Sequence, residues 1–280
     1  MRKRLRNLLS NAVNRWFNPL YKTDGISVGG SQLRVYKGTF RGVDNDGAWY
    51  AYLVRDAHVI FDIGANVGWT ALLACVYGRP NRIVLVDPNP MALTFAAGNL
   101  AMNDFAENCV FVKRFISDKP GDKVKFFTVG PGAAGSMFAV HAKTASSLAS
   151  WFWVSTTTVD ELSSRLKLVP DLIKIDVEGA EHLVLLGAAK VAQKGNPKIF
   201  VEVHSNSELS MEDNCRRILN WAATNGYAVW YLTDGTQITT PDHIKHRGRC
   251  HVLLLKEGIG YPEDLRSINQ GAELPPIVET

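Results

Sequence analysis

Hydrophobic and polar positions follow two different periods in the chain from about residue 58 onward. Short runs rich in β-branched residues are typical of buried strands, and longer stretches with apolar residues at helical spacing separate them. The strands that this pattern predicts, in chain order, are 59–63, 82–86, 110–114, 172–177, 198–203, 227–232 and 250–256. The predicted helices are 64–77 after an initial turn, 89–103, 180–194 and 211–225. This alternation predicts an α/β fold in which crossover helices join parallel strands.

Two segments do not follow this alternation. Residues 130–155 are rich in Gly, Ala, Ser and Thr and contain Trp151, Phe152 and Trp153. We interpret them as an insertion or lid that binds an acceptor; the alternative is a Gly-rich connection whose aromatic side chains pack on the core. Residues 258–280 contain three prolines and are predicted to be a weakly structured tail.

The first 17 residues have a separate pattern. Leucine, alanine, valine and tryptophan recur at helical spacing, and arginine and asparagine lie off that stripe, so a basic amphipathic helix is predicted. Such a helix either lies on an anionic membrane surface or docks on the domain, and periodicity does not distinguish the two. The sequence thus predicts a leader at 1–41, a domain at 42–257 and a tail at 258–280.

The charge of the chain is divided unevenly along its length. The formal net charge of +4 combines +8 in residues 1–41 with −4 in the rest. A mildly acidic body argues against a phosphate-binding groove, so we predict no nucleic-acid partner. The composition, 46% hydrophobic and 21% charged, is that of an ordinary globular protein and excludes a disordered or collagen-like chain.

Targeting and redox signals favour a cytoplasmic protein. The chain has no run of eighteen apolar residues, and the apolar stretch of the leader is too interrupted for a signal peptide. The four cysteines lie far apart without a Cys-x-x-Cys pair, which is typical of free thiols in a reducing compartment. We therefore predict a cytoplasmic location, with peripheral contact to the inner membrane face if residues 1–17 bind lipid.

The sharpest local motif is FDIGANVG at Phe61–Gly68, in which an apolar strand enters a glycine-containing turn and then a helix. Glycine permits close approach of a backbone to a ligand, and the start of the helix offers N–H groups. Asn66 stands where the dinucleotide fingerprint G-x-G-x-x-G has its second glycine, which argues against a nicotinamide cofactor. Asp62, just before the turn, indicates instead a ligand with a cationic group.

A second acid follows the next predicted strand. Asp87 lies 23 residues after Gly64, where the first βαβ unit of a nucleotide-binding sheet places a carboxylate on the ribose hydroxyls. The alternative is a carboxylate that stabilises the start of the helix near Asn89. Combined with the glycine turn, the spacing favours the ribose role.

Acids also gather at the end of the fourth predicted strand. Asp176, Glu178 and Glu181 fall within six residues of one another, and the fifth strand ends near Glu202 and His204. Ligands of open α/β sheets bind at the carboxyl ends of strands, so these residues are candidates for a general base and for acceptor positioning. The competing interpretation for each single residue is a solvated loop acid or a surface histidine.

Seven segments, in chain order, carry a resemblance to a known family: FDIGANVGWTAL, VLVDPNP, NLAMND, FISD, TTTVDEL, LIKIDVEGAEHLVLLGA and KIFVEVHS. Over about residues 58–206 they resemble the FkbM family of S-adenosylmethionine-dependent methyltransferases, in the class I superfamily. The resemblance implies a Rossmann-like seven-stranded sheet with one antiparallel strand and S-adenosyl-L-methionine as the cofactor. It also implies O-methylation of a hydroxyl on a saccharide, glycolipid or natural product. It fades in the leader and after about residue 206, so it does not identify the acceptor.

By position, the resemblance implies roles for individual residues. Contacts to the cofactor are implied for Asp62, Gly64, Asn66, Gly68, Asp87, Ser117, Asp118 and Asp176. At position 87 the family usually has glutamate, and the shorter acid can still reach the ribose. Residues 115–118 would lie beside the adenine, and Asp176 would lie near the methionine part.

Methyl transfer to a hydroxyl also requires a group that removes the acceptor proton. We hypothesise that Glu178 or His204 removes it, close to Asp176. Glu178 lies in the segment that resembles the family, and the pKa range of histidine suits a base. Glu181 and Glu202 would orient the base.

Three alternatives are weighed against this hypothesis. A nicotinamide-dependent reductase and a non-catalytic binding protein that retains the fold are the two other functions. Metal assistance would acidify the hydroxyl in another way, but the pair His243 and His246 has no supporting ligands nearby in the sequence, so no metal is predicted. The predicted partner is a small-molecule or glycan acceptor.

Overall fold

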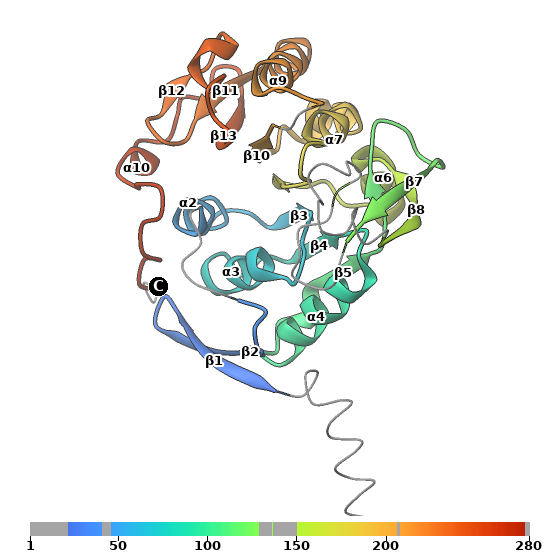
Figure 1. Cartoon of the computed structure of the whole chain (residues 1–280). Helices are drawn as coiled ribbons and strands as arrows, with labels where there is room; N and C mark the ends of the chain where they lie inside the picture. The colour runs from blue at the N-terminus through green and yellow to red at the C-terminus, as the bar shows by residue number, and fades with distance from the viewer. Residues whose placement is uncertain (1–21, 41–45, 129–135, 137–149, 206–207, 278–280) are drawn as a thin grey trace, which may run out of the picture.

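An eight-stranded sheet forms the centre of the fold (Figure 1). The computed structural model describes residues 22–40, 46–128, 136, 150–205 and 208–277. The strands of the sheet, in spatial order, are β12 (Thr236–Gln237), β11 (Tyr227–Tyr231), β13 (Arg249–Lys256), β10 (Lys198–His204), β9 (Leu172–Ile175), β3 (Val59–Ile63), β4 (Arg82–Val86) and β5 (Cys109–Val112). Residues 1–17 and most of the predicted insertion at 130–155 lie outside the described ranges.

The sheet confirms the predicted class I architecture. The five strands from β10 to β5 are parallel, and β13 lies antiparallel between β10 and β11. The one difference is β12, a two-residue edge strand that pairs with β11 and raises the number of strands from seven to eight. Two residues are too few for hydrophobic periodicity to reveal.

Helices cover both faces of the sheet. The helices are α2 (Gly47–Leu53), α3 (Trp69–Tyr77), α4 (Pro90–Ala101), α6 (Val159–Leu166), α7 (Glu181–Leu186), α8 (Ala189–Gly195), α9 (Met211–Asn225) and α10 (Glu263–Arg266). Alternate side chains of each strand point to opposite faces, so Ile60 packs with α2, α3 and α4 whereas Phe61 packs with α6 to α9. Short 3-10 turns lie at Ala106–Asn108 and Pro241–His243.

The helix predicted at 180–194 is two helices, α7 and α8. The break lies at Gly187, whose carbonyl oxygen accepts a hydrogen bond from Asp160 N (2.9 Å) at the start of α6. A side chain at Gly187 would collide with the carbonyl oxygen of Ser117. The junction is therefore set by close contact with neighbouring backbone, which helical periodicity does not report.

Part of the predicted leader belongs to the folded core. Strands β1 (Thr23–Val28) and β2 (Ser31–Tyr36) form a hairpin that buries Val28, Leu33 and Val35 in the same cluster as α3 and α4. The side chain of Asn99 on α4 accepts a hydrogen bond from Tyr36 N (2.8 Å). The predicted boundary at residue 42 thus does not coincide with the edge of the packed structure.

The tail also packs on the domain. Trp49 Nε1 donates to the carbonyl oxygen of Ile268 (2.8 Å), and the Tyr77 hydroxyl donates to that of Pro275 (2.7 Å). Ile277 N donates to the Gly29 carbonyl (2.9 Å), so the tail reaches the hairpin, as Figure 1 shows. No helix within the described ranges is long and apolar enough to cross a membrane.

A second, smaller sheet lies beside the first. Its strands β6 (Phe115–Ile116), β8 (Trp151–Thr157) and β7 (Lys123–Phe127) lie in that order, with β7 and β8 antiparallel. Figure 1 shows β7 and β8 projecting beside α6. The C-terminal part of the predicted insertion is therefore a regular strand.

Candidate functional site

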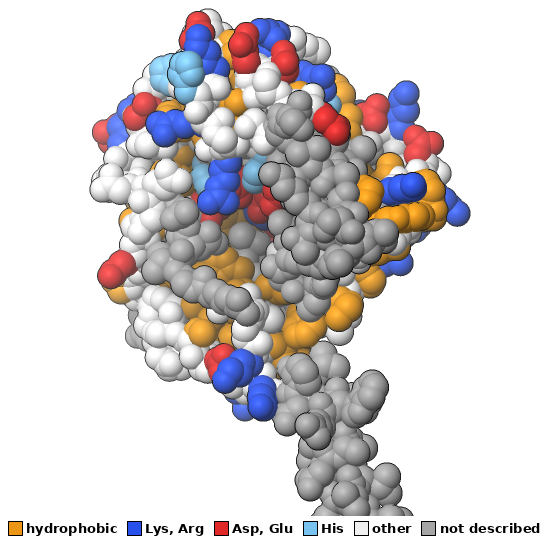
Figure 2. All heavy atoms as spheres, in the orientation of Figure 1, with side chains coloured by type: hydrophobic (Ala, Val, Ile, Leu, Met, Phe, Trp, Pro, Cys, Tyr) orange, Lys and Arg blue, Asp and Glu red, His pale blue; other side chains and the backbone are white. Residues whose placement is uncertain are grey.

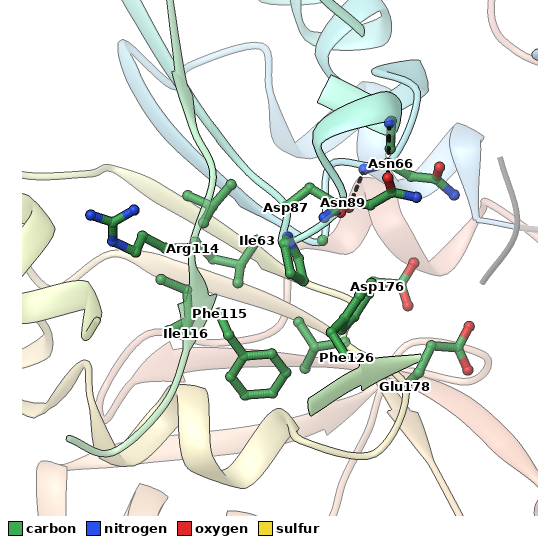
Figure 3. Close-up of a pocket in the computed structure, with 15 residues that line it drawn as sticks. Ile63, Asn66, Asp87, Asn89, Arg114, Phe115, Ile116, Phe126, Asp176 and Glu178 are labelled. Atoms are coloured by element: carbon green, nitrogen blue, oxygen red, sulfur yellow. Dashed lines mark hydrogen bonds between the residues drawn. The ribbon is translucent and has the colours of Figure 1, made fainter. Parts of the chain in front are cut away.

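The carboxyl ends of β3, β4, β9 and β10 meet at one edge of the sheet, because these four strands are parallel. The residues that follow the first three strands, Gly64, Asp87 and Asp176, line a single pocket (Figure 3). Other lining residues come from the loop after β3, the start of α4, β6, β7 and the loop after β9: Asn66, Asn89, Phe115, Ile116, Phe126 and Glu178. Three motifs far apart in the sequence thus form one site.

The loop after β3 depends on two glycines with left-handed backbone. Gly64 has φ +86°, and a side chain there would collide with the carbonyl oxygen of Asp176. Gly68 has φ +87°, and a Cβ atom there would lie 3.0 Å from Cβ of Ala96 on α4. Both glycines therefore allow parts of the protein to approach each other closely, and Gly64 alone of the two lines the pocket.

Asp87 is held rigidly at the mouth of this loop. Its Oδ2 accepts a hydrogen bond from Asn66 N (2.9 Å) and its Oδ1 accepts one from Asn89 N (2.7 Å), as the dashed lines in Figure 3 show. Burial raises the pKa of Asp87 to about 6, although the two N–H donors oppose that shift. Asn89 caps α4, since its side chain accepts from the backbone N–H of Met91 (3.0 Å).

Asp62 lies beneath the loop and is fully buried. Thr70 Oγ1 donates to its Oδ2 (2.6 Å), and Lys174 Nζ lies 3.6 Å from its Oδ1. Lys174 Nζ also donates to the Gly64 carbonyl (3.2 Å) and lies 3.4 Å from Oδ2 of Asp176. Asp62 is thus absent from the pocket lining and supports the loop through Lys174.

Burial and ion pairing act in opposite directions on this group. Burial raises the pKa of Asp62, and Lys174 and the Thr70 hydroxyl oppose it. Burial alone would lower the pKa of Lys174, but the carboxylates of Asp176 and Asp62 outweigh it and raise the pKa above its usual range. Lys174 is therefore a permanent cation below the pocket floor.

The opposite end of the pocket is apolar. Phe115, Ile116 and Phe126 line it, whereas the side chain of Arg114 points away from it in Figure 3. Ser117 and Asp118, which the sequence predicts beside the adenine, are not among the lining residues. The Ser117 hydroxyl instead donates to Oδ1 of Asp118 (3.0 Å).

A buried histidine lies beside the acidic end of the pocket. His204 Nδ1 lies 2.9 Å from Oε1 of Glu181. Its Nε2 lies 3.6 Å from Oε2 of Glu178 and 3.7 Å from Oε1 of Glu202. Figure 2 shows histidine and acidic side chains gathered with a basic one at the centre of this face. The structure thus brings together the four residues that the sequence proposes for proton removal and orientation.

Glu181 has the most complete set of partners in this cluster. It is fully buried at the start of α7, and its Oε1 accepts from Gly179 N (2.8 Å). Its Oε2 accepts from Asn214 Nδ2 (3.0 Å), which also donates to the His204 carbonyl (2.8 Å). These donors fix the Glu181 carboxylate, which in turn fixes the imidazole ring of His204.

The carboxylates decide the charge of His204. Burial alone would lower its pKa, but the hydrogen bond to Glu181 and the charges of Glu181, Asp176 and Glu178 raise it to about 9. Burial raises the pKa of Glu178, and His204 opposes that shift. Glu178 also has an unusual left-handed backbone, with φ +53°. Without ligand, His204 is therefore an imidazolium at neutral pH.

A comparison with protein families decides the class of the protein. The methyltransferase FkbM domain matches residues 62–229, more than half of the chain. The chain belongs to the FkbM methyltransferase family. Membership confirms the predicted methyltransferase class and S-adenosylmethionine as the cofactor, and it argues against a nicotinamide-dependent reductase.

A curated relative and two solved structures are similar to this FkbM-family chain. Hexuronic acid methyltransferase AglP of Haloferax volcanii is 28% identical over 149 residues, which are 52% of this chain and 56% of that protein. The chain thus spans little more than half of that relative's length. Methyltransferase FkbM from Methylobacillus flagellatus KT has 15% identity and a TM-score of 0.46, over 70% of this chain and 43% of that chain. M. jannaschii TYW2, solved in complex with AdoMet, has 12% identity and a TM-score of 0.44, over 83% of this chain and 84% of that chain.

Three residues of the FkbM-family site come close enough to share a metal ion. Ligand atoms of Asp176, Glu202 and His204 lie within 4.8 Å of one another. However, Lys174 already pairs with Asp176, and Arg249 Nη1 lies 3.1 Å from Oε1 of Glu202. These cations offset part of the negative charge that a divalent ion would need. His243 and His246 do not belong to this group.

Sequence reasoning missed Lys174 and Asn214. Lys174 is a lone charge in the apolar run of β9, a signal that a buried carboxylate partner is close by. Asn214 falls on the buried stripe of α9 that contains Met211, Cys215 and Ile218. A polar residue on such a stripe indicates a hydrogen-bonded partner in the core.

Proposed function

We propose that the protein transfers the methyl group of S-adenosylmethionine to a hydroxyl oxygen of a saccharide. The observation that carries this proposal is that the pocket and the His204 cluster meet at Asp176 and Glu178. Both residues line the pocket, and Glu178 also lies 3.6 Å from the imidazole of His204. A cofactor pocket and a candidate base thus share one wall, which is the arrangement that transfer to a protonated oxygen requires.

The lining residues of the pocket fit the chemistry of the cofactor. S-adenosylmethionine, when bound, supplies a methyl group activated by a sulfonium. Asp87 offers two fixed carboxylate oxygens for the ribose hydroxyls, and Phe115 and Phe126 offer apolar surface for the adenine. Asp176 and Glu178 place negative charge near the sulfonium and amino groups.

Several of the predicted cofactor residues act indirectly in this proposal. Gly64 and Asn66, which line the pocket, would hold the methionine part from the loop. Asp62 and Gly68 shape the loop from beneath, through Lys174 and through the contact with α4. Ser117 and Asp118 close the adenine end from outside the lining residues.

His204 is the base that we propose. Its Nδ1–H donates to Glu181, which directs Nε2 toward the wall shared with the pocket. A cation held at Asp176 would lower the pKa of His204 by repulsion, which favours the neutral imidazole. Nε2 then accepts the hydroxyl proton. Glu178 is the other group that is close enough to accept it.

Two observations support a saccharide acceptor, and an acidic one in particular. The curated relative is named as a hexuronic acid methyltransferase. Arg249, with its side chain 56% exposed beside Glu202, offers a cation at the rim of the site that suits a sugar carboxylate. The proposed partner is therefore a glycan or glycoside, not a nucleic acid. Residues 1–17 would hold the enzyme peripherally at the cytoplasmic face of a membrane on which such acceptors are built.

Titration calorimetry with S-adenosylmethionine and a labelled methyl-transfer assay test the proposal together. The wild-type chain should bind S-adenosylmethionine and methylate uronic-acid glycosides in preference to their neutral counterparts. Asp87→Ala should weaken cofactor binding by about tenfold or more, since charged hydrogen bonds are worth about 1.5–3 kcal/mol. Asp56→Asn, an exposed acid elsewhere, is the matched control. Cofactor binding without transfer to any saccharide would favour the non-catalytic alternative, and preferential binding of NADH would contradict the assignment.

A further inference from the structure

The ribbon formed by β7 and β8 has two faces of different character. On the inner face Phe126 packs against Phe152, with ring centroids 5.7 Å apart, and Phe126 also lines the cofactor pocket. The antiparallel register places Lys125 opposite Trp153 on the outer face, and Trp151 lies two residues earlier on the same face. The outer face therefore carries two tryptophans and a lysine on the reverse side of the pocket wall.

These two tryptophans are exposed to an unusual degree for their size. Trp151 is 39% exposed and Trp153 is 54% exposed. The other exposed large hydrophobic side chains within the described ranges, Met91, Leu186 and Ile259, come from three different segments. Figure 2 shows hydrophobic and basic side chains gathered over β7 and β8. Exposed aromatic residues that lie side by side mark an interaction surface more often than single ones do.

The exposed rings are fixed before any ligand binds. The centroids of Trp151 and Trp153 lie 5.8 Å apart with the ring planes at 82°. Lys125 Nζ lies 4.5 Å from the centroid of Trp151 and 5.7 Å from that of Trp153. Edge-to-face packing and two cation–π contacts hold the group, so a ligand would lose little entropy in ordering it. We call Lys125, Trp151 and Trp153 the tryptophan platform.

We propose that the tryptophan platform binds an acidic saccharide, as a site for sugar units of the acceptor that are distant from the methylated hydroxyl. The carbon-bound hydrogens on one side of a pyranose ring form a flat apolar surface that packs on an indole ring. The ammonium group of Lys125 lies over both rings, 4.5 Å and 5.7 Å from their centroids, and from there it pairs with a carboxylate on the same or the next sugar. This inference rests on the proposed function, because it assumes that the acceptor is a glycan.

The position of Lys125 favours a saccharide over a lipid surface. Lys125 Nζ lies over the faces of the two indole rings, so deep insertion of these rings into a bilayer would draw the ammonium group toward the hydrocarbon. A sugar leaves that group hydrated on one side. The platform comprises three side chains, far fewer than the 20–30 residues that each partner contributes to a standard-sized protein interface, which argues against a stable dimer through this face.

Intrinsic tryptophan fluorescence of the full chain, without S-adenosylmethionine, tests the proposal with two defined probes. Tetragalacturonate is the acidic probe and maltotetraose is the neutral one. The wild-type chain should show a saturable change with tetragalacturonate and weaker binding of maltotetraose. Trp153→Ala should weaken binding by up to about tenfold, the range of one aromatic contact. Lys125→Gln should remove the preference for the acidic probe, and Ile259→Ala, an exposed apolar residue elsewhere, should bind as the wild type does.

Three results would overturn the proposal. The first is that neither probe produces a saturable change in fluorescence. The second is that Trp153→Ala binds tetragalacturonate as tightly as the wild type does. The third is that Trp153 supports binding to phosphatidylglycerol vesicles, or self-association, in place of saccharide binding. Circular dichroism of each variant shows that it folds, and Trp151→Ala provides a second test on the same face. Because the titration contains no cofactor, it can fail while methyl transfer to saccharides persists, and platform binding can persist if methyl transfer fails. The two proposals are thus separable.

Discussion

Nδ1 of His204 lies 2.9 Å from Oε1 of Glu181. The His204 side chain is 7% exposed, and the Glu181 side chain is fully buried. The contact joins the end of β10 to the start of α7, so the imidazole is held by the packing of the sheet on its helices. With Nδ1–H donated to a buried carboxylate, one tautomer of the neutral ring is selected, in which Nε2 carries the lone pair. A carboxylate that orients a histidine is a recurrent way of building a general base.

Glu181→Gln tests the orienting contact. The amide keeps the shape of the side chain but no longer stabilises the tautomer and the charge of His204, so kcat should fall about 100-fold. The affinity for S-adenosylmethionine, measured by calorimetry, should change little, because Glu181 does not line the pocket. Asp56→Asn controls for the loss of one acidic group. An unchanged kcat would show that His204 is not the base.

Asn214→Ala removes a donor that serves both Glu181 and the His204 carbonyl. Buried acceptors left without a partner cost about 1–3 kcal/mol each, so the free energy of unfolding in urea should fall by that order. Activity at a temperature where the variant stays folded should also fall, by about tenfold, because the Glu181 carboxylate is less well fixed. Thr224→Ala, at an exposed position of α9, is the matched control. Loss of stability without loss of activity would restrict Asn214 to a structural role.

The pH dependence of turnover separates the two candidate bases. The pKa of His204 is raised to about 9 in the cofactor-free protein, so kcat/KM for S-adenosylmethionine should rise with pH toward 9. The rise of kcat with pH should occur at lower pH than the rise of kcat/KM, because the bound cofactor is cationic and disfavours the imidazolium. His204→Ala should remove the rise of kcat with pH at saturating S-adenosylmethionine, where the titration of Asp87 does not contribute. A rise of kcat at acidic pH that survives this substitution under the same conditions would assign the proton to Glu178.

Cofactor affinity should depend on pH through Asp87. Its pKa is raised to about 6, so the carboxylate that we propose as the acceptor of the ribose hydrogen bonds is protonated as the pH falls below 6. At pH 5 about one tenth of the protein retains the carboxylate, and the Kd for S-adenosylmethionine should rise about tenfold from pH 7.5. Asp87→Asn should bind weakly with no such dependence in calorimetric titrations. The same pH dependence in wild type and Asp87→Asn would place the titrating group elsewhere.

The parts of the fold that the sequence predicts well are those with a repeated local pattern. The boundaries of β3, β4 and α9 coincide with the predicted ones, because their apolar spacing and flanking residues are complete within each element. The sequence pattern places the hairpin of β1 and β2 in the leader, because its strands are short and bury few apolar side chains. Within the described part of that segment, these side chains are Val28, Leu33 and Val35. The backbone N–H of Tyr36 in this hairpin donates to the side chain of Asn99 on α4, a contact between distant parts of the chain.

The same distinction applies to the site. Sequence reasoning finds Asp87, Asp176, Glu178 and His204 because they lie at or just after predicted strand ends. The parallel topology alone brings such ends together. The environment of Asn214 depends on how α9 lies against α7 and β10, and no local pattern encodes that. Ser117 and Asp118 stand in the expected segment, but the pocket lining ends at Ile116.

Chelation tests the expected independence from metal ions. Lys174 Nζ lies 3.4 Å from Asp176 and Arg249 Nη1 lies 3.1 Å from Glu202, so the two carboxylates that could share a metal ion with His204 already have cations. A divalent ion would have to displace both and also compete with the proton on His204. Turnover should therefore be the same with and without EDTA, and added Mg²⁺ should not raise it. Loss of activity in EDTA that is restored by one metal would mean that the ion displaces Lys174 and Arg249 when the cofactor binds, and that the acceptor proton is removed by a different route.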